Sequence, residues 1–497
     1  MNPPPPEPNQ NQPPYGLPTS DESGSDDDQP NQETKSSSNH SHSSSSPTSF
    51  SPSISTTTTP ISSSASTNSL TEREVYSFGQ NSYGELGHGH TEERRVPVRI
   101  EFCRGKNIVC IAAGNEHTCL LSDTGVVYAA GYNDSGQCGT GNSGRVPSLQ
   151  AVESFRGHGV VKLISSNGCE HTSAVTEDGE LWTCGYNARG QLGHGNKTHQ
   201  SVPRLIESLR AYRVKHVSCS YYHSIVACED GKIFGFGRND YGQLGLGHNE
   251  DKLRPTPITF FNGQRIIDIA CGQYHSLVSV GSGGIFAFGK NDYGQLGIVP
   301  NEPKWHPVMV TGSEALQSGE IIPRIACGYY HSLALKKDGT VFSFGRNDYG
   351  QLGLGNNEGS RVPKQIDALS TLAIREVTSG CYHSIALTRT GSVYVWGRNN
   401  HGQLGIGTTD DCNTPSRIDA LIHKTALQVT AGFYHTLILT GSPDDEVGSL
   451  SLSGVNNFNT NNNNNYNGMY KQEEEKEEEF VVIGTSCVIF IFLILFF

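Results

Sequence analysis

One loop motif, the phrase Gly-x-Asn-x-x-Gly-x-Leu-Gly, occurs seven times along this chain, with Cys138 in place of the leucine in one copy. The copies begin at Gly79, Gly131, Gly185, Gly237, Gly289, Gly345 and Gly397, at intervals of 52, 54, 52, 52, 56 and 52 residues. A second phrase, roughly Gly-x-x-His-Ser/Thr, keeps the same period and supplies His117, His171, His223, His275, His331, His383 and His435. A period of about fifty residues is typical of solenoids, propellers and arrays.

Each repeat has the pattern of a β-hairpin that leads into a tight loop. Residues 331–345 show it, because two short apolar runs flank the turn Asp338-Gly339. Glycine tolerates the positive φ that such turns require. The asparagine of the loop phrase is expected to hold the loop through side-chain to backbone hydrogen bonds. Every unit is therefore predicted to be a small antiparallel sheet.

The two ends of the repeat region complement each other. It begins at Glu74 with the second strand of a hairpin and ends near Thr440 with the first strand of another. Pairing residues 435–440 with 74–79 would complete a seventh sheet and remove two exposed edges. We therefore predict an all-β fold, a seven-bladed β-propeller of four-stranded antiparallel blades whose last blade is closed by N- and C-terminal strands. An open solenoid is the competing geometry.

The two linked phrases, in this order and number, resemble the regulator of chromosome condensation repeat family over about residues 72–441. The resemblance implies the propeller fold and an out-of-phase start that splits one blade between the termini. The founding member is a nucleotide exchange factor for the small GTPase Ran on chromatin, and other members are interaction modules. A plant relative senses UV-B light through tryptophans in its Gly-x-x-His phrases. The phrases of this chain contain none.

The chain divides into four segments. Residues 1–71 form a Pro/Ser/Thr/Asn-rich tail that is expected to be disordered, because it has few large apolar groups to bury. Residues 72–441 form the propeller, and residues 442–479 form an acidic Asn/Glu-rich linker. The formal charge of −13 lies in the two tails. DNA is therefore an unlikely partner, since binding to DNA depends on neutralising its phosphates.

The last segment, residues 480–497, is apolar and carries no charge. Eighteen helical residues span roughly 27 Å, close to the thickness of a thin bilayer core. We predict a C-terminal transmembrane helix, a tail anchor that leaves the propeller in the cytosol. The acidic flank Glu473–Glu479 opposes this prediction, because basic residues usually stand on the cytoplasmic side. The alternative is a soluble cytoplasmic or nuclear protein, or an apolar end produced by a gene-model error.

No catalytic constellation stands apart from the repeats, and we expect neither a metal nor another cofactor. One histidine per blade is interpreted as a buried structural group, because a metal site needs three or four ligands at coordination distance. The glycine phrase is interpreted as a tight turn, since no Gly-Lys-Ser/Thr follows any copy. Thirteen cysteines without a Cys-x-x-Cys pair indicate free thiols in a reducing compartment.

The predicted function is a monomeric, membrane-tethered propeller that binds another protein. The alternatives are an exchange factor or regulator for a small GTPase, and a chromatin-associated propeller. The longest interval between repeats contains Asn301–Glu320, and within it Trp305 and Met309 are the candidate partner contacts. Exposed aromatic residues are common binding hot spots. The simpler interpretation of that segment is a slightly longer loop.

Overall fold

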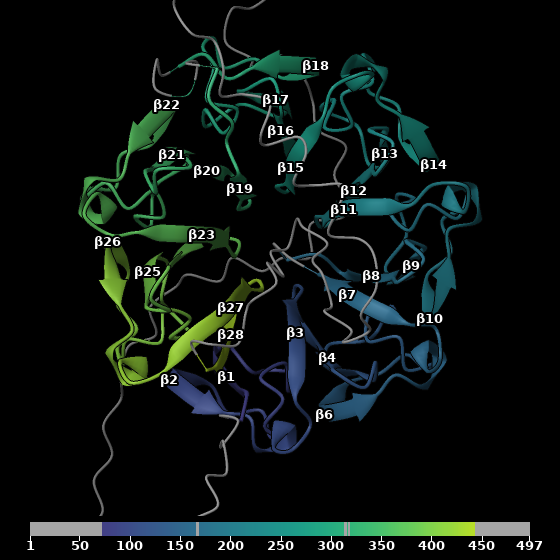
Figure 1. Ribbon diagram of the computed structural model, residues 1–497, viewed down its shortest axis with the longest axis vertical. Helices are drawn as coiled ribbons and strands as arrows, with labels where there is room; N and C mark the ends of the chain where they lie inside the picture. The colour runs from purple at the N-terminus through teal and green to yellow at the C-terminus, as the bar shows by residue number, and fades with distance from the viewer. Residues whose placement is uncertain (1–71, 166–167, 313–315, 317–318, 443–497) are drawn as a thin grey trace, which may run out of the picture. The chain divides into compact units, whose positions relative to one another are not determined.

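A computed structural model describes residues 72–165, 168–312, 316 and 319–442. These residues form seven antiparallel sheets of four strands each, arranged radially around a centre (Figure 1). Six short 3₁₀ helices join consecutive sheets, namely η1 Glu101–Cys103, η2 Glu153–Phe155, η3 Glu207–Leu209, η4 Thr259–Phe261, η5 Asp367–Leu369 and η6 Asp419–Leu421. The predicted fold class, a seven-bladed β-propeller, is confirmed.

Each blade is built from an innermost, a second, a third and an outer strand. The innermost strands are β3 Ile108–Ala113, β7 Val160–Ile164, β11 Val214–Cys219, β15 Ile266–Cys271, β19 Arg324–Cys327, β23 Ile374–Ser379 and β27 Thr425–Ala431. The second strands are β4 His117–Ser122, β8 His171–Thr176, β12 His223–Cys228, β16 His275–Val280, β20 His331–Leu335, β24 His383–Thr388 and β28 His435–Gly441.

The third strands are β5 Val127–Gly131, β9 Leu181–Gly185, β13 Ile233–Gly237, β17 Ile285–Gly289, β21 Val341–Gly345, β25 Val393–Gly397 and, in the last blade, β1 Glu74–Gly79. The outer strands are β6 Val146–Ala151, β10 Gln200–Leu205, β14 Lys252–Pro257, β18 Lys304–Met309, β22 Ser360–Gln365, β26 Cys412–Arg417 and β2 Arg94–Arg99. We number the blades by their innermost strands, so that blade 1 contains β3 and blade 7 contains β27.

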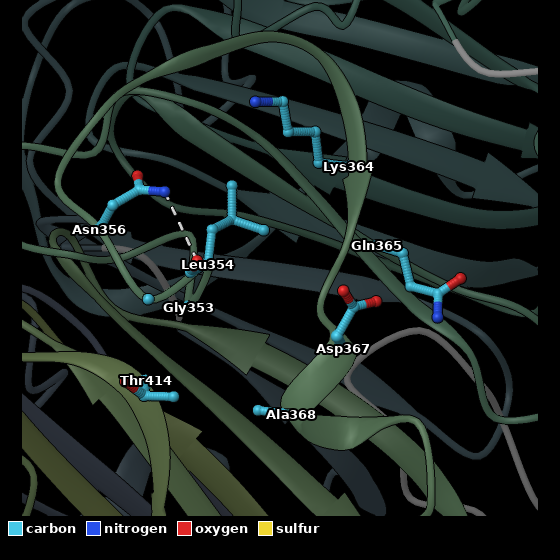
Figure 2. Close-up of a pocket in the computed structure, with 9 residues that line it drawn as sticks. Gly353, Leu354, Asn356, Lys364, Gln365, Asp367, Ala368 and Thr414 are labelled. Carbon is cyan, nitrogen blue, oxygen red and sulfur yellow. Dashed lines mark hydrogen bonds between the residues drawn. The ribbon is translucent and has the colours of Figure 1, made fainter.

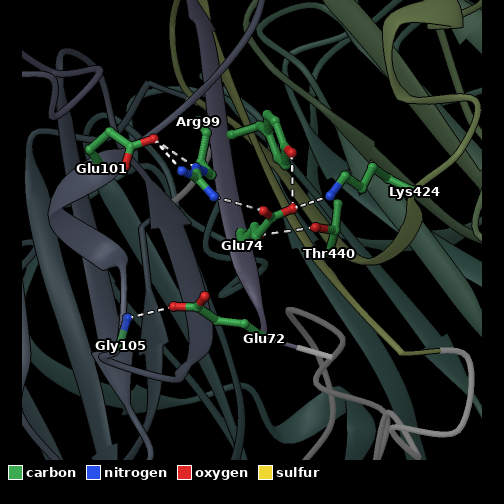
Figure 3. Close-up of polar contacts among 8 residues, drawn as sticks. Glu72, Glu74, Arg99, Glu101, Gly105, Lys424 and Thr440 are labelled. Carbon is green, nitrogen blue, oxygen red and sulfur yellow. Dashed lines mark hydrogen bonds and ion pairs between the residues drawn. The ribbon is translucent and has the colours of Figure 1, made fainter. Parts of the chain in front are cut away.

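Blade 7 is closed by strands from both ends of the described chain. Strand β1 pairs with β28 in the predicted register, from Glu74 opposite Thr440 to Gly79 opposite His435. The Glu74 carboxylate bonds Arg99 at 3.0 Å on the outer strand and also bonds Lys424 (Figure 3). The prediction of a closed ring is therefore confirmed, and the open solenoid is excluded.

The loop asparagines have the role that the sequence predicted for them. In blade 5 the Oδ1 of Asn347 accepts the Leu352 N–H at 2.8 Å, and its Nδ2 donates to the carbonyls of Asn356 and Glu358 at 2.9 Å. All seven loop asparagines are fully buried. One buried side chain thus satisfies several backbone groups, which fixes a long loop without regular secondary structure.

Three segments predicted from the sequence lie outside the described residues. They are the N-terminal tail 1–71, the linker 442–479 after its first residue, and the membrane anchor 480–497. Over the described ranges, no helix is long and apolar enough to cross a bilayer. The twelve cysteines within those ranges are all free, and eleven of them are buried.

Candidate interaction face

Seven buried histidines join each blade to the next. The Nε2 atom of His331 lies 3.0 Å from the Ser384 hydroxyl of the following blade, and the other six histidines make the same contact with a Ser or Thr hydroxyl. Ser384 in turn donates to the Gln351 carbonyl at 2.8 Å, so its hydroxyl accepts the proton that His331 carries on Nε2. Burial lowers the pKa of all seven histidines to about 3. They are neutral structural groups, as predicted.

The residue before each of these histidines lies in the loop that enters the second strand. In blades 3 to 7 this residue is a half-buried tyrosine, and the set is Tyr222, Tyr274, Tyr330, Tyr382 and Tyr434. The rings of Tyr222 and Tyr274 are stacked with centroids 6.3 Å apart, as are those of Tyr382 and Tyr434 at 6.4 Å, and the tilted rings of Tyr274 and Tyr330 lie 6.3 Å apart. The tyrosines therefore form an arc over five consecutive blades.

Four cations occupy the spaces between these tyrosines. Each follows the first glycine of the loop phrase, and the set is Arg238, Lys290, Arg346 and Arg398. The Arg346 guanidinium lies 5.8 Å from the ring centroids of both Tyr330 and Tyr382, and Arg238 lies 4.9 Å and 5.1 Å from Tyr222 and Tyr274. We call these five tyrosines and four cations the tyrosine–cation arc.

The backbone fixes each cation in its place. The Arg346 N–H donates to the Tyr330 carbonyl at 2.9 Å, and the same bond joins Arg238 to Tyr222. In each blade the tyrosine directly precedes the second strand, and the cation directly follows the third strand, which pairs with the second. Cation and ring are therefore set by sheet register, and each such contact contributes about 0.5–1 kcal/mol at an exposed site.

Carboxylates neutralise part of this positive charge. Three of the cations form an ion pair with the aspartate two residues after them in the sequence. The pairs are Arg238–Asp240, Lys290–Asp292 and Arg346–Asp348. Arg398 differs, because Asn400 stands two residues after it instead of an aspartate. The Arg398 guanidinium donates to the Tyr434 hydroxyl at 2.9 Å. Arg398 is therefore the one cation of the arc that has no aspartate two residues after it.

Carboxyl groups replace the tyrosines in blades 1 and 2. Glu116 and Glu170 precede their histidines there, and Glu85 replaces a loop glutamine that the other six blades share. Burial, with the nearby charges of Glu85 and Glu170, raises the pKa of Glu116 to about 7. Burial likewise raises the pKa of Glu170, which accepts the Tyr221 hydroxyl at 2.8 Å. This end of the propeller therefore has a cationic aromatic sector and a separate carboxyl sector.

The family model for an RCC1-like domain matches residues 72–438 of this chain. The chain belongs to the RCC1-like family. Its membership covers the whole propeller and agrees with the resemblance that the loop and histidine phrases predicted.

Curated relatives of this RCC1-like protein differ widely in how much of their own length it matches. It is 36% identical to the Ultraviolet-B receptor UVR8 of Arabidopsis thaliana over 361 residues, covering 72% of this chain and 80% of that one. It is 31% identical to the human E3 ubiquitin-protein ligase HERC2, but that match covers 76% of this chain and only 8% of the ligase. The match thus takes up only a small part of the ligase.

Solved structures of RCC1-like proteins share the fold. Yeast RCC1 (Prp20), in its complex with Kap60, superposes with a TM-score of 0.66 at 23% identity, covering 76% of this chain and 91% of that one. Human WBSCR16 gives a TM-score of 0.66 at 24% identity, covering 74% and 99%. At this identity the likeness shows the fold alone.

The two candidate contacts predicted from the sequence lie on a strand of this RCC1-like propeller. Trp305 and Met309 belong to β18, the outer strand of blade 4, and are 46% and 39% exposed. The segment Asn301–Glu320, which was interpreted as a slightly longer loop, therefore contains strand β18 in its first part. Strand β18 follows its loop glycine at the same spacing as β14 does, so the additional residues come after Met309. The Trp305 backbone lies against Gly242 in the loop of blade 3.

A rim pocket of 370 Å³ lies at blade 5, between η5 and the loop at Gly353–Asn356 (Figure 2). Lys364, Asp367 and Thr414 contribute to its lining, and the Asn356 amide donates to the Leu354 carbonyl across one side. Its lining residues include no nucleophile paired with a base. We assign this pocket no role.

Sequence reasoning missed the tyrosine–cation arc, although its signal was present. Five of the seven histidine phrases end in Tyr-His, and four of the seven loop phrases carry Arg or Lys after their first glycine. The two positions are sixteen residues apart along the chain. Only the pairing of second and third strands shows that they meet.

Proposed function

We propose that this RCC1-like propeller is a protein-interaction module that binds its partner through the tyrosine–cation arc. The observation that supports the proposal is the alternation of five half-buried tyrosines with four cations at one end of the disc. Tyrosine and arginine are the side chains enriched in binding hot spots, because they combine large contact area with hydrogen bonding. No catalytic step is part of the proposal.

The solved relatives give this proposal a precedent. One structure shows Kap60 bound to yeast RCC1, and another concerns the binding of Prp20p to Gsp1p and histones. These are protein partners of those proteins. A partner of this chain is expected to present carboxylates and apolar groups to the arc.

The test compares two matched double variants of the full chain. Tyr330→Ala with Arg346→Ala removes one unit of the arc, at the start of β20 and the end of β21. Lys337→Ala with Arg389→Ala alters exposed residues beyond the far ends of β20 and β24, at the opposite end of the disc. Partners identified by in-cell cross-linking are then purified, and their affinities measured. Loss of roughly tenfold or more with the first variant alone supports the proposal. Equal affinity for both variants excludes the arc.

Small-GTPase regulation remains the second candidate, because the solved relative Prp20p is described with its binding to Gsp1p. An exchange factor distorts its partner and needs no catalytic motif of its own. Release of fluorescent GDP from a panel of purified GTPases tests this candidate. Stimulated release by the wild-type chain would replace the scaffold proposal with an exchange activity, whereas no release from any member would remove the candidate. Chromatin association, the third candidate, predicts salt-sensitive retention on DNA.

Trp305 and Met309 stay a second proposed contact, on the outer edge of blade 4. Trp305→Ala with Met309→Ala should weaken the affinity for a partner that binds the rim and leave the affinity for a partner of the arc unchanged.

The membrane anchor at residues 480–497 also stays a proposal, because it rests on the uncharged sequence of that segment. Imaging the full chain beside a chain that ends at residue 479 tests it, since an unchanged diffuse signal would contradict anchoring.

A further inference from the structure

A second row of aromatic side chains lies beside the tyrosine–cation arc. Its members stand four residues after the first glycine of the loop phrase in blades 3 to 6, and they are Tyr241, Tyr293, Tyr349 and His401. Each ring packs against the arc tyrosine of the following blade. The centroids of Tyr293 and Tyr330 are 5.2 Å apart, and those of the other three pairs are 5.0–5.5 Å apart. We call the arc together with this row the aromatic face.

The cations of the arc are enclosed by rings from both rows. The Arg346 guanidinium lies 5.1 Å from the Tyr293 centroid and 6.0 Å from the Tyr349 centroid, in addition to its two contacts with arc tyrosines. Arg398 likewise lies 4.6 Å from the Tyr349 centroid. Rings and cations thus form one continuous surface, on which Tyr293 is 41% exposed.

The tyrosine hydroxyls of this surface are hydrogen-bond donors at neutral pH. Burial raises the pKa of Tyr330 and of Tyr382, so both hydroxyls keep their protons. Within the ranges that the structure describes, neither hydroxyl bonds another residue. The guanidinium groups add N–H donors beside them. A fitting ligand therefore offers apolar surface to the rings and acceptors to these donors.

Proline-rich segments combine these two properties. Proline has no N–H, so such a backbone offers carbonyl acceptors, while its rings dock on aromatic side chains. A polyproline II helix advances about 3.1 Å per residue, so two residues cover about 6.2 Å. The Tyr222 and Tyr274 centroids are 6.3 Å apart, and so are those of Tyr274 and Tyr330. Alternate residues of such a helix can therefore lie over adjacent rings.

The chain itself supplies a segment of this kind. Pro3–Pro14 reads PPPPEPNQNQPP, with seven prolines and one carboxylate. The single carboxylate, on Glu7, suits a face on which Arg398 is the cation without an aspartate two residues after it. The linker 442–479 suits the face less, because its nine acids would meet the exposed Asp292 and Asp348. Charge thus favours the proline-rich segment as the occupant.

The chain between this segment and the propeller is long enough for it to reach the face. Strand β1 begins at Glu74 and runs toward the arc, because its last residue, Gly79, lies opposite His435. The segment must therefore pass from one end of the disc to the other, a strand length of about 20 Å. Residues 15–71 provide 57 positions, and a flexible chain of that length spans about 40 Å.

We propose that the aromatic face binds Pro3–Pro14 of its own chain and that this segment competes with a partner there. The inference rests on the proposed function, since it names a second occupant of the same arc. An effective concentration of about 1 mM, with an intrinsic Kd of about 0.1 mM, would leave the face free about one-tenth of the time. The apparent affinity for a partner would then be roughly tenfold weaker.

Photo-crosslinking of the full chain tests the proposal without a partner. Tyr15→p-benzoylphenylalanine places the reactive group directly after Pro14, and mass spectrometry identifies the crosslinked peptides. We expect crosslinks within one chain to the loops that contain Tyr330 and Tyr382. The segment is tested by replacing its seven prolines with serine, which should remove these crosslinks and strengthen the binding of an arc partner about tenfold.

The two double variants described above serve as the matched pair for the face. Tyr330→Ala with Arg346→Ala should reduce the crosslinking yield about fivefold or more. Lys337→Ala with Arg389→Ala, at the opposite end of the disc, should leave the yield unchanged. Circular dichroism checks that all variants fold.

Three results would overturn the proposal. They are crosslinks spread evenly over the disc, an equal yield from both double variants, and covalent dimers in dilute solution in place of crosslinks within one chain. If partner binding depended on Tyr330 while no crosslink reached its loop, the proposed function would stand and this inference alone would be removed.

Discussion

The Nε2 atom of His435 lies 3.2 Å from the hydroxyl of Thr118, although 317 positions separate the two residues along the chain. Every other histidine of this set bonds the blade that follows it in sequence. His435 bonds the first blade from the last, so this contact joins the two blades beside the β1–β28 pairing that closes the ring.

Thr118→Val should therefore destabilise the closed ring. The valine keeps the shape of threonine and leaves the His435 nitrogen unsatisfied in a buried site, which costs about 1–3 kcal/mol. Urea unfolding measures the change. Ser384→Ala, which removes the hydroxyl bonded by His331, is the matched control inside the row and should cost a similar amount. If Thr118→Val left the free energy of unfolding unchanged while Ser384→Ala lowered it, the stability of the ring would not depend on the contact between His435 and Thr118.

The buried histidines predict a steep loss of stability in acid. Each has a pKa of about 3 in the folded chain, set by burial, against about 6.5 when unfolded. Unfolding therefore takes up protons between these values, and stability falls as the pH falls from 6.5 toward 3. Each histidine contributes at most about 1.4 kcal/mol per pH unit.

Glu85, Glu116 and Glu376 act in the opposite direction between pH 4.5 and 7, because their pKa values are raised to about 7. The fall in stability should accordingly steepen below about pH 4.5. His331→Gln can still donate to Ser384 but cannot titrate, so it should reduce the slope by about one proton. Unfolding free energies measured from pH 7 to pH 4 provide the check, and an unchanged slope would contradict it.

Glu85→Gln should stabilise the protein at alkaline pH. The Glu85 Oε1 is buried without a hydrogen-bond partner, and burial raises the pKa of the carboxyl to about 7. A raised folded pKa gives stability that is present below the unfolded value of 4.5 and is lost as pH rises through 7. The variant avoids this loss, so its advantage at pH 8 should be about 1–3 kcal/mol and should shrink at pH 5. Thermal melts at the two pH values test this, and an equal advantage at both would refute it.

Gly242→Ala should be among the most damaging single changes outside the blade cores. Gly242 has φ of +80°, and a Cβ there would lie 2.5 Å from the Trp305 Cα of the next blade. We expect a loss of about 2–4 kcal/mol, from the left-handed backbone together with the clash. Gly355→Ala is the matched control, with φ of +76° and open space around its Cβ position, and should cost about 1 kcal/mol. Equal costs would show that backbone conformation alone determines the effect.

The sequence predicted the architecture in detail because its repeats encode backbone hydrogen bonding. The register of Glu74 opposite Thr440 followed from which half of a hairpin each end contained. The role of Asn347 followed from its place in a glycine-rich loop. Both are local properties, and repetition made each of them visible seven times.

The sites were harder to predict because they depend on contacts between repeats. Tyr330 and Arg346 meet only through the pairing of the second and third strands. The interval between repeats revealed additional residues in blade 4 but not their position, and the structure places them after Met309, at the end of β18.

The pairing of β1 with β28 also sets an order of events during synthesis. Strand β1 leaves the ribosome early, while its partner on the inner side emerges more than 350 residues later. Throughout that time Val75–Phe78 presents an apolar strand with an unpaired edge, the kind of segment that associates with other chains. Blade 7 is consequently the last to assemble, and a cell making this protein must shield its first strand until translation has passed Gly441.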